Sequence, residues 1–363
     1  MCCRRVVCED RPNRIGSRQF VVDLYERKMY FACMKNYTWG IIGPGKIANK
    51  FAVALTLAEG ARLGAVASRD GERAREFASA HGAERWYDSY EQLAEDSAID
   101  VVYIATPHGF HAEHALLCLR RGKAVLCEKP MALFCGQVRE MVDAAREHNA
   151  FLMEAMWTRF LPVIETTLEL IRQGRIGSVR YVRADFGFFA PFNPEGRLYS
   201  LRLGGGSLLD IGVYPLFLCL QLLGEPDSIR AAGHLSPTGS DESCHAILQY
   251  RDGRSAVLSS TLACPTGITA EIGGTEGLIQ LPGPWYKNDK LLLRAGADQK
   301  ESVPETLQLE PMVNGFEYQI REVMRCLDAG LVESPSMSHA FSLMMSEVMD
   351  AIRGQIGVEY PGE

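Results

Sequence analysis

TWGIIGPGKIA, residues 38–48, is the stretch that decides the fold. An apolar run ends here in Gly-x-Gly-x-x-Ala, and residues 49–59, which follow directly, favour a helix. The order of strand, glycine turn and helix is typical of a dinucleotide-binding motif. Gly43 permits the tight turn, Gly45 lets a pyrophosphate approach the backbone, and Ala48 lets the helix pack close to the sheet. The free N–H groups and the positive dipole end of the helix would face the phosphates. The alternative is a glycine turn that holds no ligand.

Helix and strand patterns alternate over residues 35–155. Predicted strands at 63–68, 101–105 and 124–127 alternate with predicted helices at 71–81, 89–96, 111–121 and 137–149. The run Val101–Ala105 is apolar throughout, as a parallel strand buried on both faces requires. The alternation predicts an α/β domain with a Rossmann-type, doubly wound parallel sheet that binds ligands at the carboxyl ends of its strands.

The pattern changes after Trp157. Longer strands with turn signals between them are predicted at 179–188, 228–235, 245–250, 255–261 and 268–273, and helices at 206–223 and 315–329. Residues 156–335 are therefore predicted to form an α+β domain with a large, open-faced, mostly antiparallel sheet. Residues 336–363 are expected to form a C-terminal helix, over 338–353, and a tail. The open face should be flat and apolar and should need a partner, which predicts a homo-oligomer.

Composition excludes some classes of protein. The 363 residues carry a net charge of −7, which argues against a nucleic-acid-binding surface. The apolar segment 208–223 is interrupted by Asp210, Pro215 and Gln221, so it is interpreted as a buried helix rather than a membrane span. The eleven cysteines are scattered without a Cys-x-x-Cys pair, which indicates free thiols in a reducing, cytoplasmic compartment. Residues 1–34 lack a sustained period and a secretory apolar region, and we expect a disordered or mis-assigned extension.

The end of the second predicted strand bears on the choice of cofactor. Folds of this kind that bind NAD usually place an acidic side chain there to bond the ribose 2′-hydroxyl. Ser68 and Arg69 stand in that place, and a hydroxyl and a cation suit a 2′-phosphate. Asp70 follows and could cap the next helix, while Lys46 adds positive charge in the glycine turn. The pattern favours NADP, with NAD less favoured, unless Arg69 is only a solvated surface residue.

Two further motifs carry charged or phenolic side chains. Glu128-Lys129-Pro130 ends an apolar strand where a ligand is expected, although a plain surface ion pair would look the same. The proline restricts Lys129 to an extended conformation and permits a cis bond.

The second motif is GGGSLLDIGVY, residues 204–214. Ser207 could cap a helix on which Asp210 and Tyr214, four residues apart, share one face. The helix dipole would keep Asp210 ionised. The Tyr214 phenol could exchange a proton with a substrate if Lys129 lowers its pKa, and the alternative is a core tyrosine with a satisfied hydroxyl.

Together the glycine turn, Glu128-Lys129-Pro130 and residues 204–214 resemble the Gfo/Idh/MocA oxidoreductase family, from Met34 to near the C-terminus. Within it, residues 153–160 and the Asp210/Tyr214 pair resemble the group of dihydrodiol and NADP-dependent D-xylose dehydrogenases. Inositol dehydrogenases carry histidine in place of Tyr214.

The resemblance implies a role for each matching residue. The pyrophosphate would be held by Gly43, Gly45, Lys46, Ile47 and Ala48, and the 2′-phosphate by Ser68 and Arg69. The nicotinamide side would be lined by Thr106, Pro107, His108 and His111, with Glu128 and Lys129 beside it. Trp157, Arg159 and Phe160 would shape the substrate pocket. His108 and His111 also allow a metal pair, but without a third ligand no metal is predicted.

The implied activity is hydride transfer between NADP(H) and a carbinol carbon of a sugar or cyclic diol. Tyr214 would take the hydroxyl proton, Lys129 would stabilise the phenolate and the alkoxide, and Asp210 would orient the pair. One alternative is a reductase of an oxo- or anhydro-sugar. The other is a catalytically silent NADP-binding regulator, which predicts loss of one of these three residues.

Overall fold

The computed structural model describes residues 35–296 and 303–362. The chain divides into two compact units, Met1–Lys35 and Asn36–Glu363, and the account below concerns the second. The predicted extension over residues 1–34 lies outside the described residues.

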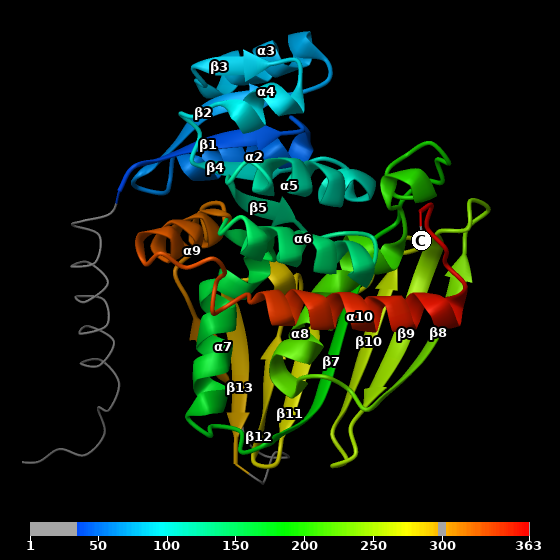
Figure 1. Cartoon of the computed structure of the whole chain (residues 1–363). Coiled ribbons are helices and arrows are strands. Elements are labelled where there is room, and N and C mark those ends of the chain that lie inside the picture. The colour runs from blue at the N-terminus through cyan, green and yellow to red at the C-terminus, as the bar shows by residue number, and fades with distance from the viewer. Residues whose placement is uncertain (1–34, 297–302, 363) are drawn as a thin grey trace, which may run out of the picture. The chain divides into compact units, whose positions relative to one another are not determined.

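The first part of this unit is a six-stranded parallel sheet in the order β3-β2-β1-β4-β5-β6 (Figure 1). Its strands are β1 (Tyr37–Ile42), β2 (Ala61–Ala67), β3 (Arg85–Tyr87), β4 (Val101–Ile104), β5 (Ala124–Glu128) and β6 (Leu152–Ala155). Its helices are α2 (Lys46–Leu55), α3 (Gly71–His81), α4 (Tyr90–Glu95), η2 (His108–Phe110), α5 (His111–Leu119) and α6 (Cys135–Glu147). The order reverses between β1 and β4, which is the point where sheets of this kind bind their ligands. The predicted Rossmann-type sheet is confirmed.

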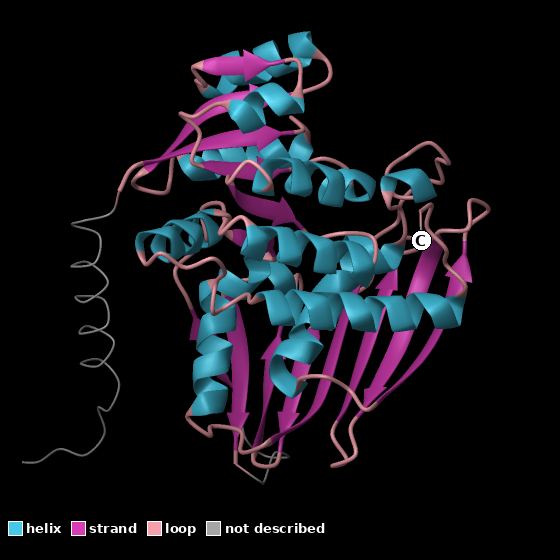
Figure 2. Ribbon diagram, in the orientation of Figure 1, coloured by secondary structure: helices cyan, strands magenta, loops and turns pink. Residues whose placement is uncertain are grey.

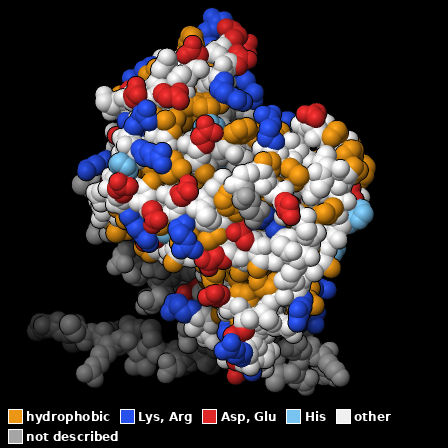
Figure 3. Space-filling view, turned by 45° about the vertical axis from the view of Figure 1, so that its right-hand side comes forward, with side chains coloured by type: hydrophobic (Ala, Val, Ile, Leu, Met, Phe, Trp, Pro, Cys, Tyr) orange, Lys and Arg blue, Asp and Glu red, His pale blue; other side chains and the backbone are white. Residues whose placement is uncertain are grey.

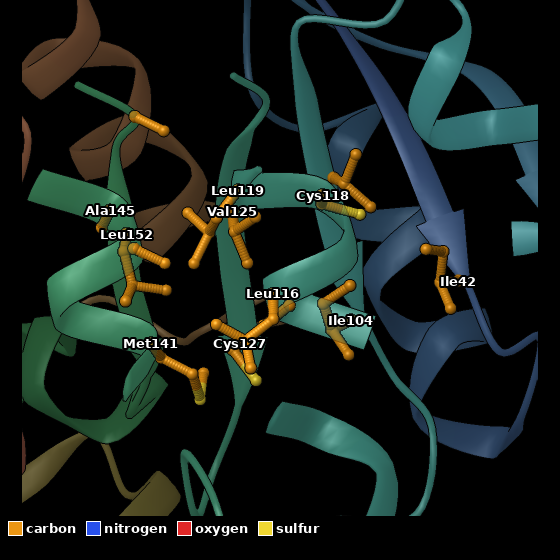
Figure 4. Close-up of a cluster of buried hydrophobic side chains, with 14 of the residues drawn as sticks. Ile42, Ile104, Leu116, Cys118, Leu119, Val125, Cys127, Met141, Ala145 and Leu152 are labelled. Carbon is orange, nitrogen blue, oxygen red and sulfur yellow. The ribbon is translucent and has the colours of Figure 1, made fainter. Parts of the chain in front are cut away.

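Helices pack against this sheet through an apolar core. Side chains of β1, β4, β5 and β6 meet those of α5 and α6 in one cluster (Figure 4), and Ile104, Val125 and Met141 within it are fully buried. Two of the free cysteines, Cys118 and Cys127, lie buried in the same cluster. The continuous apolar strands are thus explained by burial on both faces.

The second part is an eight-stranded sheet in the order β14-β13-β12-β11-β7-β10-β9-β8. Its strands are β7 (Val179–Gly187), β8 (Ser228–Leu235), β9 (Asp241–Gln249), β10 (Ser255–Thr261), β11 (Ala270–Gly274), β12 (Gly277–Leu281), β13 (Lys290–Ala295) and β14 (Glu305–Gln308). Strands β7 and β10 pair in parallel and the other neighbours are antiparallel, so the predicted mostly antiparallel sheet is confirmed. The accompanying helices are α7 (Pro162–Arg172), α8 (Val213–Leu223), α9 (Glu317–Asp328) and α10 (His339–Ile356), with short turns η3 (Trp157–Phe160), η4 (Leu201–Leu203) and η6 (Trp285–Lys287).

One face of the large sheet packs against α8 and α10, as Figure 2 shows. Val182, Ala184 and Phe186 of β7 are buried on this face. On the opposite face Tyr181 is 37% exposed, and Arg183 forms an ion pair of 2.9 Å with Glu271. The expectation of an apolar open face is therefore wrong in part, because charged and apolar side chains share it. Over the side of the molecule in Figure 3, basic and acidic side chains are likewise interspersed.

The predicted helix at 206–223 has two parts. Residues Leu208–Gly212 form a π-helical turn, η5, and α8 continues from Val213. By length and composition the span Leu201–Leu223 could cross a membrane, but 89% of its apolar window is buried inside the protein. The prediction of a buried core helix is confirmed.

Candidate active site

The glycine turn after β1 leaves space and donors for a phosphate. Gly43 has a φ of +88°, and a Cβ there would lie 2.8 Å from the Thr106 side chain. At Gly45 the nearest atom to such a Cβ is 4.0 Å away, so the position is open. Helix α2 begins at Lys46 with neither a side-chain cap nor an acidic residue in its first turn. Free helical N–H groups beside open backbone fit the pyrophosphate of a dinucleotide.

Two arginines follow β2, Arg69 shortly after its end and Arg73 in the first turn of α3. Arg69 lies over the Phe110 ring, with 5.7 Å from Cζ to the ring centroid. Arg73 donates to the carbonyl of Pro44 from Nε at 3.2 Å and from Nη2 at 2.9 Å. Asp70 caps α3 by accepting from the Arg73 backbone, as the sequence suggested. Arg73 was missed, although it lies in the first turn of the predicted helix that follows Arg69.

Two histidines follow β4, and the rings of both lie within hydrogen-bonding distance of backbone carbonyls. His108 Nδ1 is 2.9 Å from the Gly204 carbonyl, which ties η2 to the glycine run. Both nitrogens of His111 lie 2.8 Å from carbonyls, those of Thr106 and Pro130. A neutral imidazole can donate to only one of them. Burial lowers the pKa of His111 to about 4, so we assign it the neutral form near pH 7. These two rings therefore connect loops and are not a free metal-ligand pair.

Lys129 lies where three segments of chain meet. Its amine donates to the backbone carbonyl of Asp210 at 2.5 Å and lies 3.7 Å from the Asp210 carboxylate. The same amine is 5.0 Å from the centroid of the Tyr214 ring. Beneath it, Glu128 accepts a short hydrogen bond from Tyr103, and burial raises the pKa of Glu128 to about 7. The structure thus brings together Lys129, Asp210 and Tyr214, which are remote in sequence.

Three side chains approach one oxygen of Asp210. Arg197 Nη1 is 2.7 Å from Oδ1, Lys129 Nζ is 3.7 Å from it and His108 Nε2 is 4.0 Å from it. Burial alone would raise the pKa of Asp210, but Lys129 and Arg197 lower it to about 2. The expected ionised state is therefore produced mainly by neighbouring cations rather than by a helix dipole. Sequence reasoning missed Arg197, which no motif marks.

The Tyr214 hydroxyl lies in an aromatic cluster. It accepts a hydrogen bond of 3.0 Å from the indole Nε1 of Trp157. The rings of Phe186 and Tyr286 pack beside it at 5.6 and 5.2 Å, and Phe316 stacks on Trp157 at 4.9 Å. Burial raises the pKa of Tyr214 well above its usual value. The expectation that Lys129 lowers this pKa is wrong, because the amine lies over the ring face and burial dominates.

Two further sequence expectations need correction. Ser207 does not cap the helix, since its hydroxyl donates to the buried carboxylate of Asp241 at 2.7 Å. Asp241 also accepts from the Leu208 backbone at 2.7 Å, and so it takes the part expected of Ser207.

Arg159 was expected in the substrate pocket. Its guanidinium instead donates to the Ser336 carbonyl at 3.1 Å and pairs with Glu165 of α7 at 2.5 Å. Phe160 is buried with the Arg159 guanidinium 5.9 Å from its ring. Arg159 is therefore held by contacts within the protein that involve the Ser336 backbone and α7. Within the described ranges no group of three His, Cys, Asp or Glu side chains could hold a metal ion.

Comparison with known proteins finds matches for both parts of the fold. Residues 37–156 match a profile described as an oxidoreductase family with an NAD-binding Rossmann fold, and residues 164–280 match the GFO/IDH/MocA C-terminal domain. A trans-1,2-dihydrobenzene-1,2-diol dehydrogenase from Xenopus tropicalis is 43% identical over 89% of this chain and 99% of its own. The Mus musculus enzyme of the same name is 39% identical over 89% of this chain and 98% of its own.

Solved structures show the same two-part architecture. A 3-ketoreductase from Actinomadura kijaniata, in complex with NADP and TDP-benzene, is 28% identical with a TM-score of 0.78, and the match covers 89% of this chain and 98% of that one. A levoglucosan dehydrogenase in complex with NADH and levoglucosan shares the fold with a TM-score of 0.81 at 23% identity, over 89% of this chain and 98% of that one.

The fold and these relatives define an NAD(P)-dependent dehydrogenase that acts on CH–OH groups. The chain belongs to the Gfo/Idh/MocA oxidoreductase family.

Proposed function

We propose that the protein transfers a hydride between NADP(H) and a carbinol carbon of a sugar or a cyclic diol. The observation that carries this proposal is the position of the Lys129 amine, 3.7 Å from the Asp210 carboxylate and 5.0 Å from the centre of the Tyr214 ring. When bound, the nicotinamide supplies the hydride acceptor or donor. The protein supplies binding, orientation and a place for the hydroxyl proton.

The preference for NADP rests on the residues after β2. Arg69 and Arg73 provide two guanidinium groups, which suit a phosphate monoester. The Asp70 carboxylate is engaged in capping α3 and is thereby less available to a ribose hydroxyl. Ser68 is largely buried, and its hydroxyl accepts from the Asp70 backbone at 3.2 Å, so it shapes this loop.

Proton transfer is assigned to Lys129, with Tyr214 as a hydrogen-bond donor to the substrate oxygen. Burial lowers the pKa of Lys129 and raises that of Tyr214. The amine is therefore the member of the pair whose neutral form becomes accessible nearer physiological pH. In the oxidation direction Lys129 would take the hydroxyl proton, and Tyr214 would stay protonated. In reduction the ammonium would return the proton to the developing alkoxide.

The aromatic cluster supports a ring-shaped substrate. Phe186, Tyr286 and Trp157 surround the Tyr214 phenol. Apolar ring faces beside an amine and a carboxylate suit a molecule with one apolar face and several hydroxyl groups, as in cyclic diols and pyranoses. Relatives that are named dihydrodiol dehydrogenases are up to 43% identical to this chain, which supports a cyclic diol as the substrate.

The test is an assay of NADP reduction with trans-dihydrodiols, aldopentoses, aldohexoses and inositols as candidate substrates. We expect turnover of a dihydrodiol or an aldose by the wild type and none by Lys129→Met. A wild-type protein that binds NADP but turns over no member of the panel, in either direction, would refute the proposed function.

A reductase of an oxo- or anhydro-sugar is the second candidate. It is supported by the similarity to a 3-ketoreductase. The same residues serve both directions. NADPH oxidation with keto-sugars tests the reductase, and NADP reduction with levoglucosan tests the reverse direction on an anhydro-sugar. A silent NADP-binding regulator is disfavoured because Lys129, Asp210 and Tyr214 are all present and adjacent.

We also infer a cytoplasmic homo-oligomer that pairs through the open face of the large sheet. Free, buried thiols such as Cys219 and Cys244 suit a reducing compartment. The exposed Tyr181 and Ile247 on this face, with Arg183 and Glu271 between strands, suit a self-complementary contact.

A further inference from the structure

The Oδ1 atom of Asp210 is shared between a reacting amine and a surface guanidinium. Lys129 approaches it at 3.7 Å, and Arg197 approaches it at 2.7 Å. The Arg197 side chain is 58% exposed, whereas that of Asp210 is only 8% exposed. Arg197 therefore reaches Asp210 from the solvent side, whereas the Lys129 side chain is only 11% exposed. The second carboxylate oxygen, Oδ2, makes none of these contacts.

The segment that carries Arg197 is held firmly, although it lies between β7 and η4 without regular structure. The Ser200 N–H donates to the Gly196 carbonyl at 2.9 Å, which closes a turn around Arg197. Tyr199 is buried, and its hydroxyl donates to the Ala190 carbonyl at 2.9 Å. Thr238 donates to the Tyr199 carbonyl at 2.5 Å. An arginine anchored on both sides of its position loses less entropy when it holds a carboxylate than a free surface arginine would.

We propose that Arg197 is a positioning residue that occupies Oδ1 of Asp210 and thereby leaves the Lys129 amine available to the substrate oxygen. This inference rests on the proposed function. Without Arg197, Lys129 would be the nearest full cation to a buried carboxylate. The amine would then be drawn toward Asp210 and would release its proton less readily.

The charges around Lys129 give the sign of the effect. Burial lowers the pKa of Lys129, the carboxylates of Asp210, Glu128 and Glu154 raise it, and Arg197 lowers it. His108 and His111 also face this site, but burial lowers their pKa values to about 3 and 4, so both rings are neutral near pH 7. Tyr214 is neutral as well, because burial raises its pKa. Loss of the Arg197 charge must therefore raise the pKa of Lys129.

The experiment compares Arg197→Gln, Arg197→Lys and the control Arg172→Gln with the wild type. Arg172 pairs with Glu169 on the surface of α7, so its loss removes an ordinary exposed ion pair. The pH profile of kcat/KM is measured for alcohol oxidation. In Arg197→Gln the part of the pH profile that reports the loss of the Lys129 proton should shift to higher pH by about one unit. At pH 7 kcat/KM should fall by about tenfold. Arg197→Lys and Arg172→Gln should keep the wild-type limb.

A second readout needs no turnover. The rate at which acetic anhydride modifies Lys129 in cofactor-free protein, followed by mass spectrometry across pH, reports the pKa of the amine. The pKa of the Lys129 amine measured in this way should rise in Arg197→Gln and stay at the wild-type value in Arg197→Lys.

An Arg197→Gln protein with lower kcat but an unshifted limb and unshifted amine reactivity would overturn the inference, since a purely structural role predicts that result. So would an Arg197→Lys protein that behaves like Arg197→Gln. If the wild type turns over no substrate in the panel, the proposed function fails. The acetylation profile then still decides whether Arg197 controls Lys129.

Discussion

The indole nitrogen of Trp157 donates a 3.0 Å hydrogen bond to the hydroxyl of Tyr214, 57 positions away in the sequence. Trp157 belongs to the turn after the last strand of the parallel sheet, and Tyr214 to the long core helix of the second sheet. This bond fixes the orientation of the phenol, and with the neighbouring rings it leaves the tyrosine little freedom to turn.

Trp157→Phe should reduce kcat by about fivefold, because one hydrogen bond to the Tyr214 hydroxyl is worth roughly 1 kcal/mol. Phenylalanine can keep the stacking on Phe316, so cofactor binding should change little. The control is the same substitution in a Tyr214→Phe background, where it should have almost no further effect on kcat. Equal losses in both backgrounds would show that Trp157 acts independently of the phenol.

Lys129→Met should lower kcat/KM by at least about a thousandfold, while NADP affinity stays close to the wild-type value, because the amine acts on the transferred proton. Tyr214→Phe should lower kcat by about ten- to a hundredfold and keep the pH limb, since the phenol stays protonated. For both variants, steady-state kinetics measures kcat and kcat/KM, and fluorescence titration measures the affinity for NADP. A Tyr214→Phe enzyme without a pH limb would move the role of base from Lys129 to Tyr214.

Arg69→Ala should narrow the preference for NADP over NAD by about tenfold, the equivalent of one lost charge-assisted contact of roughly 1.4 kcal/mol. Asp70→Ala is the matched control. It removes the cap of α3 and should lower stability by about 1 kcal/mol but leave the preference unchanged. The dissociation constants of NADP and NAD, measured for each variant, test this prediction. An Arg69→Ala protein with the wild-type ratio of the two constants would contradict the assignment of Arg69 to the 2′-phosphate.

Asp241 should make stability depend on pH. Burial raises its pKa from 3.8 to about 6, so its neutral form favours the folded state. Its contribution is full below pH 3.8, is lost as pH rises through about 6, and amounts to about 3 kcal/mol. Relative to the wild type, Asp241→Asn should therefore gain stability between pH 4 and 7 in urea unfolding. A constant difference across this range would show that the carboxyl group titrates normally.

Ile247→Glu should weaken the proposed oligomer, because it adds a charge to the open face of the large sheet, where Ile247 is 45% exposed. Val303→Glu, at a position 89% exposed outside this sheet, is the control. Sedimentation velocity at micromolar concentration should show a smaller species for Ile247→Glu alone. A wild-type protein that is already monomeric would end the proposal.

Local chemistry explains why several elements of both parts of the fold were predictable. The helix over residues 71–81 and the strands 228–235 and 255–261 match their predicted bounds, because caps, glycine turns and apolar runs are short-range signals. Several short strands were not predicted from the sequence. Strand β3 has only three residues, Arg85–Tyr87, and strand β14 has only four, Glu305–Gln308. Such strands exist because neighbouring strands offer hydrogen-bonding partners, which a local pattern cannot show.

By itself, the sequence determined the glycine turn, the Rossmann-type sheet, the buried core helix and the membership of Lys129, Asp210 and Tyr214 in the candidate site. Only the tertiary structure decided their electrostatics. Arg197 reaches Asp210 from a loop that no motif marks, and the Lys129 amine lies over the Tyr214 ring rather than at its hydroxyl. A pKa depends on burial and on charges within a few ångströms, and those are set by segments that folding brings together from distant parts of the chain.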